Sequence, residues 1–445
     1  MNTPPFYKRR KFWKRFLLFA LALPIFLAGV SVGIVYIKQD DIVQTLISTL
    51  NKDFKGKIEV KDSHITAFDN FPYISVDLED VKIYESKEDS SLTIANIREV
   101  FLGFDVSTII GGNLNINDIK LKNGTIDLIQ HIDGSLNIEN ALSTEDDAEE
   151  IEDVNDEFHL AIHEIELENI DIHKLNEENN IIFDALVYQA DAKFTTSPEH
   201  IFVFLDSKFE LNLIEGGDTT FIKHKHFELH TKLDYLTEKE VLNLQRTKIQ
   251  LENSEFEMEG SVDFKDDVNL DIEIKGNKEN YDLIFAAAPE ELIPALKRYE
   301  NSGLLFFELN IEGKSIHGHS PDINATFGCK DGFFKNKIKN SEVNDLNFLG
   351  TFTNGKEKSL KTSELIIRDF SANPAEGQLM ANLRVSNFED PEVDFQINTN
   401  FELTFLKDFF NLTDIKDLSG AVELEMNFHD IINIDAPEHA ISKLN

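Results

Sequence analysis

The sequence predicts a mainly β protein: an N-terminal transmembrane helix, then an extended antiparallel β-sheet with few short helices. Three observations lead to this fold class. The segment 16–37 carries no charge, most of the remaining chain alternates apolar and polar residues, and phenylalanine (36) far outnumbers methionine (4). Alternation with a period of two is typical of strands that have one buried and one wet face. A core rich in phenylalanine and poor in methionine favours rigid β packing.

The charge of the chain is strongly uneven. Lys and Arg number 43, Asp and Glu number 81, and the net charge over 445 residues is −38. Residues 1–37 contain six cations and no acid, which leaves −44 for the rest of the chain. The six cations are Lys8, Arg9, Arg10, Lys11, Lys14 and Arg15. A body this acidic is repelled by nucleic acid and by anionic headgroups, which excludes a nucleic-acid-binding protein.

The uncharged segment 16–37 predicts a membrane anchor. As a helix it would span ~33 Å, and the hydrocarbon core of a bilayer is ~30 Å thick. Basic residues crowd its N-terminal side, so the positive-inside rule places residues 1–15 in the cytoplasm and the body across the membrane. The anchor residues include Phe16, Leu17, Leu18, Pro24, Phe26, Ile34, Tyr36 and Ile37. The alternative is a cleaved signal peptide with its cleavage site at Gly29-Val30-Ser31, but the apolar region would then be only about 7–15 residues long.

After the anchor the period of the apolar residues changes from helical to extended. Residues 40–54 predict an amphipathic helix, because apolar residues recur at helical spacing after the capping residue Asp40. From about Lys57 onward the pattern alternates strictly, as in antiparallel strands. Clear examples are Ile74–Leu78, Phe209–Leu213, Leu270–Ile274, Phe395–Ile397 and Val422–Phe428. The best candidates for helices inside this region are Pro289–Tyr299 and Leu403–Phe410.

Two repeats run through the strand-rich region. The first is a short unit, apolar-x-x-apolar-x-apolar-x-Asn, which occurs at Ile116–Asn123 and again at Ile162–Asn169. The second is a strand, a helix and a glycine-led strand, which occur in that order over residues 268–311 and again over 391–428. Recurrence in a fixed order predicts an array of similar β units stacked along an axis.

The run EDDAEEIEDVNDE at residues 145–157 divides this array. It is too acidic to fold, so we predict a flexible surface loop between an N-terminal β subdomain (57–144) and a repetitive β body (158–445). A β array should end in a protective cap, and the residues that lead to Asn445 show no capping element. This predicts that the chain is the N-terminal portion of a longer protein.

No enzymatic constellation stands out, which predicts a protein without catalytic activity or cofactor. The sequence has no Gly-rich phosphate loop, no G-x-S-x-G elbow and no H-E-x-x-H. Its single cysteine, Cys329, excludes an intrachain disulfide. His224, His226 and His230 share strand parity with Glu228, so a metal site is geometrically conceivable. A polar outer face explains the same residues, and we predict no metal site.

The apolar stripes on the strands have two interpretations. They pack against each other in a closed sandwich core, or the sheet curls and its apolar face lines an open groove for hydrocarbon. Alternation alone does not separate these two structures.

The stretch Asp105–Leu142 resembles the recurring segment of the AsmA-like family of bacterial envelope proteins. An apolar Leu/Ile-Gly element leads into the short repeat, a second strand follows, and an Asp-Gly turn precedes Leu-Asn-Ile-Glu-Asn. The matching residues are Ile116, Ile119, Leu121, Asn123, Asp133, Gly134 and Asn137. The anchor, the following helix, Phe71-Pro72-Tyr73 and the larger duplication also fit. The departures are the insertion at 145–157 and the apparent absence of the family's C-terminal region.

The resemblance implies a long, taco-shaped β groove and a role in outer-membrane maintenance. It implies a protein anchored in the bacterial inner membrane whose body carries phospholipid across the periplasm, without a bond made or broken. Outer-membrane or periplasmic proteins would be its partners. The apolar parity of one strand, with Leu305, Phe307 and Leu309, would line the groove. The alternative function is a membrane-tethered β scaffold that influences outer-membrane protein assembly and carries no lipid.

Overall fold

The computed structural model describes the residues 44, 47–48, 51–52, 54–66, 73–88, 91–105, 114–143, 158–177, 180–215, 218–219, 223–265, 268–278, 281–287, 293–315, 319–375, 377–412 and 417–431. No helix among these residues is long and apolar enough to cross a membrane. The predicted anchor (16–37) and the predicted acidic loop (145–157) lie outside the described residues. Of the predicted helix 40–54, the structure describes residues 44, 47, 48, 51 and 52 as helical.

The chain forms two compact units, Met1–Phe194 and Thr195–Asn445, called unit 1 and unit 2 below. The boundary falls inside the range that the sequence predicts as one repetitive body. Both units are mainly β, with strands that pair mostly antiparallel and few short helices, so this part of the predicted fold class is confirmed.

Unit 1 contains seven strands among its described residues. In chain order the elements are β1 (Lys57–Glu59), β2 (Asp62–Thr66), β3 (Tyr73–Tyr84), β4 (Thr93–Asp105), β5 (Leu114–Gln130), α3 (Asn137–Leu142), β6 (Phe158–Asn176) and β7 (Ile181–Thr196). β1 and β2 both pair with β3, and the order then continues β3–β4–β5–β6–β7. Every pair is antiparallel except β5–β6, which is parallel. A parallel neighbour needs a crossover, and the chain between β5 and β6 contains α3.

Unit 1 has a closed hydrophobic core. Val76, Ile94, Ile97, Phe104 and Ile170 are at most 2% exposed. They lie on neighbouring strands in register, since Val76 pairs with Leu102 and Phe104 with Ile116. Interior side chains packed this closely account for most of the stability of a domain.

The short repeat corresponds to a strand with two irregularities. The ladder between β5 and β6 shifts register after Ile116, which is where the repeat has two polar residues in a row. It skips Asn123 and Asn169, whose φ angles of 56° and 53° are left-handed. Asparagine tolerates this backbone better than most residues. The register shift after Ile116 moves the following side chains to the other face of β5, so Ile116 and Ile119 share one apolar face.

Unit 2 is an antiparallel meander. Its elements are β8 (His200–Glu215), β9 (Asp218–Thr219), β10 (Lys225–Leu236), β11 (Val241–Leu251), β12 (Ser254–Asp263), β13 (Asn269–Lys278), α4 (Asp282–Ala287), α5 (Ile293–Leu296), β14 (Tyr299–Lys314), β15 (Asp322–Asn336), β16 (Glu342–Thr353), η3 (Leu360–Thr362), β17 (Glu364–Pro374), β18 (Gln378–Ser386), β19 (Glu392–Glu402), α6 (Leu403–Phe409) and β20 (Ala421–Ile431).

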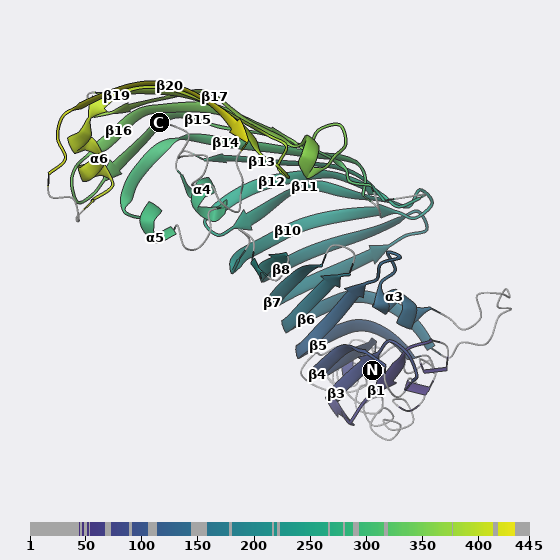
Figure 1. Cartoon of the computed structure of the whole chain (residues 1–445). Helices are drawn as coiled ribbons and strands as arrows, with labels where there is room; N and C mark the ends of the chain where they lie inside the picture. The colour runs from purple at the N-terminus through teal and green to yellow at the C-terminus, as the bar shows by residue number, and fades with distance from the viewer. Residues whose placement is uncertain are drawn as a thin grey trace, which may run out of the picture. The chain divides into compact units, whose positions relative to one another are not determined.

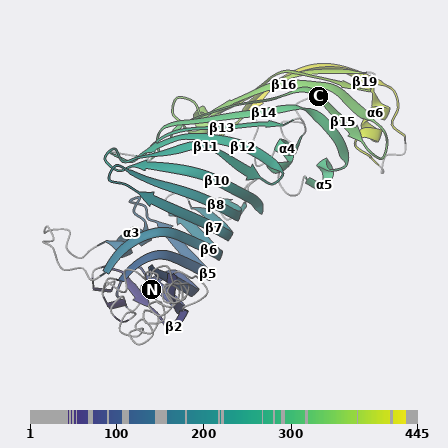
Figure 2. The same cartoon turned by 180° about the vertical axis from the view of Figure 1, so that it is seen from behind.

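β8 pairs with β9 and β10, and from β10 to β20 each strand pairs with the next one along the chain. The sheet curls, and α4 lies on its concave side (Figures 1 and 2). The predicted helix at Leu403–Phe410 is confirmed by α6. The helix predicted at Pro289–Tyr299 is shorter in the described residues, because Tyr299 begins β14.

A line of bulges bends four neighbouring strands of unit 2. The residues with positive φ are Gly303 in β14, Asp331 in β15, Asp345 in β16 and Asp369 in β17, and each lies at a register shift. The amide of Asp331 donates to Asn347 Oδ1 at 2.9 Å, so a side chain replaces the ladder partner that the bulge removes. Bulges increase local twist and bend a strand, which gives this sheet its curl.

Candidate functional site: an apolar sheet face and a cavity beside α6

One face of the unit 2 sheet carries an apolar row that runs through twelve strands. Consecutive members are direct cross-strand partners, and Ser207 at the first strand is the only polar member. The row consists of Ser207, Leu229, Ile249, Phe256, Gly276, Phe307, Phe327, Gly350, Ile367, Leu383, Phe395 and Phe428. Each link is a pair of side chains on the same face, which is the unit of packing in a sheet.

The neighbouring row on the opposite face is polar in all but one position. Its members, one residue along each strand, are Asp206, His230, Lys248, Glu257, Lys275, Glu308, Thr326, Thr351, Ile366, Arg384, Asp394 and His429. Ion pairs join neighbouring strands on this face, such as Arg384 Nε to Glu364 Oε1 at 2.6 Å. Along these two rows the sheet therefore has one apolar and one mainly charged face.

The apolar row is only partly covered. Its larger side chains, from Leu229 to Phe428, are all half-buried, whereas a closed sandwich would bury them. The buried apolar side chains that the structure describes in unit 2 belong to α4, to α6 or to the cluster described next. Among the described residues, no second layer of strands or helices covers the remaining apolar face.

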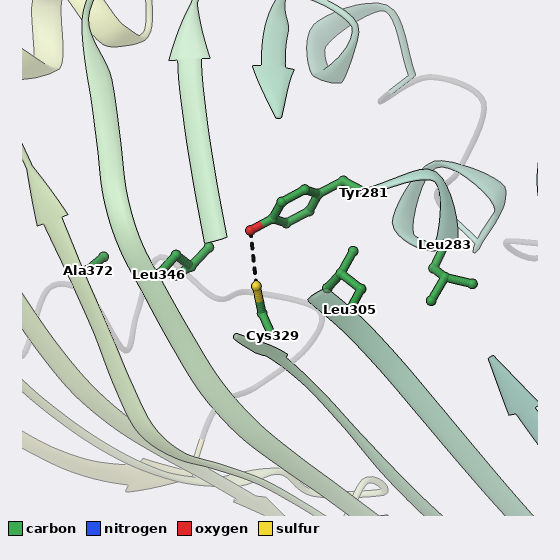
Figure 3. Close-up of a cluster of buried hydrophobic side chains, with 6 residues drawn as sticks. All are labelled: Tyr281, Leu283, Leu305, Cys329, Leu346 and Ala372. Atoms are coloured by element: carbon green, nitrogen blue, oxygen red, sulfur yellow. Dashed lines mark hydrogen bonds between the residues drawn. The ribbon is translucent and has the colours of Figure 1, made fainter. Parts of the chain in front are cut away.

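A compact cluster, the α4 cluster, covers one part of this face (Figure 3). It consists of Tyr281, Leu283, Leu305, Cys329, Leu346 and Ala372. The Tyr281 hydroxyl lies 3.2 Å from Cys329 Sγ, and both side chains are buried. Burial raises the pKa of Tyr281 and the pKa of the Cys329 thiol, so both groups stay protonated. Gly332 leaves the space for Tyr281, since a Cβ there would meet the Tyr281 hydroxyl.

α6 is fixed against the same face at the edge of the sheet. Asn336 Nδ2 donates to the carbonyl oxygens of Asp408 (3.2 Å) and Phe409 (2.7 Å), and the Tyr299 hydroxyl donates to Phe409 O at 3.0 Å. These carbonyls belong to the last turn of a helix, where no intrahelical partner exists. Asn336 is 1% exposed, so its hydrogen bonds form in a dry environment and hold α6 firmly.

A cavity of about 520 Å³ lies between α6 and the apolar face of β14–β20. Its lining is Tyr299, Phe334, Val343, Leu346, Phe370, Ala372, Pro374, Leu379, Ile397, Thr399, Phe401, Phe405, Leu406, Phe409, Phe410, Val422 and Leu424. Thr399 and Tyr299 supply hydroxyls to the lining. The Thr399 hydroxyl donates to Gln378 O at 2.9 Å, and that of Tyr299 is used by Phe409. This site is called the α6 cavity below. Its apolar lining suits a hydrocarbon chain, and it offers few hydrogen-bond partners to a lipid headgroup.

The three predicted groove residues of β14 lie on the apolar face, in different surroundings. Leu305 is 4% exposed inside the α4 cluster. Phe307 belongs to the apolar row and meets Phe256 edge to face, with ring centroids 6.4 Å apart. Leu309 is half-buried, opposite Ile274 and Ala325. The structure thus brings the three side chains to one face, with Leu305 covered by Tyr281.

The residues of the predicted family motif lie in unit 1. Ile116 is buried, and Ile119 and Leu121 continue its face along β5, up to Asn123 with its positive φ. Asp133 and Gly134 form the turn after β5, where the Ser135 amide donates to Asp133 Oδ1 and Gly134 has a φ of 90°.

Asn137, the last motif residue, is fully buried at the start of α3. Its amide group accepts from the Ile129 amide at 3.0 Å and donates to Asp127 O at 2.9 Å. It thus pairs with β5 as a neighbouring strand would. All seven motif residues thus belong to the strand, the turn and the helix start of unit 1, and the α6 cavity belongs to unit 2.

The histidine group pairs with carboxylates. Nδ1 of His224 lies 2.5 Å from Glu210, Nδ1 of His226 lies 3.0 Å from Glu252, and His230 lies 2.5 Å from Asp206. Within the described residues no group of three or more metal-ligating side chains could hold an ion.

The walls of the α6 cavity were not among the residues predicted from the sequence. Tyr299, Phe405 and Phe409 are central to it, and none of them belongs to the predicted groove lining. A signal does exist, because Phe401, Phe405 and Phe409 recur every four residues, which is the spacing of an apolar helical stripe. Asn336 gives no such signal, since nothing in its local sequence indicates a partner in α6.

Comparison with known proteins does not extend this description. A scan against family models, a search of curated proteins and a search of solved structures each found no match to this chain. We therefore infer a function from the chemistry of the site.

Proposed function

We propose that the protein is a membrane-anchored lipid carrier whose unit 2 binds the acyl chains of phospholipid on its apolar face. The observation that carries this proposal is the apolar row, which continues through twelve strands and stays half-buried. The α6 cavity supports it, because its lining suits a hydrocarbon chain and leaves the headgroup outside. The chemistry is passive binding and sliding.

The energetics favour such binding without a specific headgroup site. Each acyl methylene that leaves water for an apolar surface gains ~0.8 kcal/mol. A partly covered apolar row thus provides affinity for any acyl chain along its length. The charged opposite face keeps the sheet soluble and prevents lipid from binding there.

The predicted anchor supplies the location in this proposal. Residues 16–37 would hold the chain in the bacterial inner membrane, with residues 1–15 in the cytoplasm and the body in the periplasm. A body tethered there would carry phospholipid toward the outer membrane and so maintain the envelope. The AsmA-like resemblance points to the same role.

The test is bound lipid in the purified protein. We expect native mass spectrometry of the full chain, purified in detergent, to show co-purifying phospholipid. Leu309→Asp would place an unpaired ion on the apolar face, at a cost of several kcal/mol to lipid binding, and should remove most of the lipid. Asn310→Asp, on the same strand and the opposite face, is the matched control and should retain it.

Folding of the variants is checked by circular dichroism. If Leu309→Asp does not fold, Leu424→Asp takes its place, because Leu424 lines the α6 cavity and is already 40% exposed. Wild-type protein that carries no phospholipid, or folded apolar-face variants that retain it, would contradict the proposal. The non-transporting scaffold would then be the better function.

A further inference from the structure

Cations gather at one edge of unit 2, although the chain as a whole is acidic. The five residues Lys335–Lys339 contain three lysines and no acid, and of these lysines Lys335 forms an ion pair with Glu342 at 3.5 Å. Lys297 and Arg298, which precede β14, lie beside this turn, since the Lys337 amide donates to Arg298 O at 3.4 Å. The side chains of Lys297, Arg298, Lys337 and Lys339 are exposed, and they are called the basic edge below.

Apolar side chains project at the same edge. Ile338, at the tip of the β15–β16 turn, is 69% exposed and stands between two of the lysines. Phe410 and Leu412 follow α6 directly and are also exposed. Asn336 joins the two elements, because it precedes the turn and binds the last carbonyls of α6. A single exposed apolar side chain is ordinary, whereas apolar side chains that gather at one place on a surface, as Ile338, Phe410 and Leu412 do here, mark an interaction site.

The basic edge adjoins the α6 cavity. Tyr299 follows Arg298 and lines that cavity, as does Phe334, which precedes the lysine-rich turn. A partner bound to the basic edge would therefore lie beside the place where an acyl chain fits.

We propose that the basic edge docks on the surface of an anionic bilayer, with Ile338 inserted at the level of the headgroups. Lysine and arginine bind anionic lipid surfaces, and an apolar tip among them is the usual composition of an interfacial contact. The net charge of the chain does not prevent this, because charges beyond ~8 Å are screened at physiological ionic strength. This inference goes beyond lipid binding, since it concerns the outer surface and not the apolar face.

The opposite edge of the sheet provides a matched comparison. The β16–β17 connection also has lysines, Lys356 and Lys361, and an exposed leucine, Leu360. There, however, Glu357 interrupts the lysines, and Lys358 forms an ion pair with Asp322 at 2.9 Å. Its cations are thus partly neutralised, and Lys356 and Lys358 line a small polar pocket instead of adjoining the α6 cavity.

The experiment measures vesicle binding by the full chain. The protein is held in nanodiscs of phosphatidylcholine, so that its predicted anchor is occupied, and is floated with separate vesicles. We expect binding to vesicles of equal parts phosphatidylcholine and phosphatidylglycerol, and none to phosphatidylcholine alone. Lys337→Gln with Lys339→Gln should weaken it about 25-fold, because each cation contributes about fivefold. Ile338→Ser should weaken it as well.

The control variant is Lys356→Gln with Lys361→Gln, which should bind as the wild type does. Equal binding to both kinds of vesicle, an equal loss in the control, or no loss in the Lys337 and Lys339 variant would each overturn the proposal. If the Lys337 and Lys339 variant lost binding only when an acidic protein had been added, the basic edge would bind a protein and not the bilayer. Variants that no longer dock should retain their co-purified phospholipid, so failure of docking and failure of lipid binding are distinguishable.

Discussion

The two units share the same alternation of apolar and polar residues, but the apolar face that results is buried to different extents. In unit 1 the apolar face is closed, and side chains such as Ile94, Ile97 and Phe104 are almost fully buried. In unit 2 the apolar row stays half-buried, except where α4 and α6 cover its face. Alternation therefore predicts that a strand has an apolar face, but not what covers that face.

The largest difference between the units should appear in their stability. Phe104→Ala in unit 1 should cost about 3–5 kcal/mol, because it empties a closed core. Phe395→Ala in the apolar row of unit 2 should cost only about 1 kcal/mol, because Phe395 is half-buried. Urea unfolding with hydrogen exchange read separately in β4 and β19 measures both. Equal costs would mean that the apolar face of unit 2 is covered as well as the core of unit 1.

Removing a contact that holds α6 should lower the stability of unit 2 by a smaller amount. Asn336→Ala leaves Asp408 O without its Asn336 donor and Phe409 O with the Tyr299 hydroxyl alone, which should cost about 1–3 kcal/mol. Faster hydrogen exchange in α6, together with less co-purified phospholipid, is the expected result. Asn310→Ala, on the exposed face of β14, is the control and should change neither. Unchanged exchange in α6 would show that Asn336 does not hold this helix.

The side chains of the α4 cluster are as well buried as the core of unit 1. The free energy of unfolding of unit 2 should depend modestly on pH through this cluster. Burial raises the pKa of Cys329 above its ordinary 9.0 and that of Tyr281 above 10.0. Because their pKa values are raised in the folded state, the folded protein favours the protonated forms of both groups. Their contribution to the free energy of unfolding is therefore complete below pH 9 and falls as the pH rises through the pKa values of the folded state. Chemical denaturation between pH 8 and 11 should show this fall, less steeply in Cys329→Ala with Tyr281→Phe. An identical slope in that variant would assign the fall to other groups.

The sequence predicts much of the sheet and less of the site. Period-two alternation at Leu270–Ile274 and Val422–Phe428 identifies strands correctly, because one face of each strand is apolar and the other charged. The parallel β5–β6 pair gives no local signal, since it depends on the crossover through α3. The α4 cluster depends on Gly332 and Tyr281, which are far apart in sequence and meet only through strand register. Likewise, the bulge at Asp331 takes its donor site from Asn347 on the next strand.

Site-specific photocrosslinking in native membranes shows whether the apolar face of unit 2 holds acyl chains. A photoreactive residue replaces Leu424, which lines the α6 cavity, or Met380, which lies on the opposite face. The two side chains are 40% and 43% exposed, so their access to solvent is matched. If the apolar face holds acyl chains, a phospholipid adduct should form at position 424 and none at 380. Adducts at both positions in equal yield, or none at 424, would contradict lipid binding on this face.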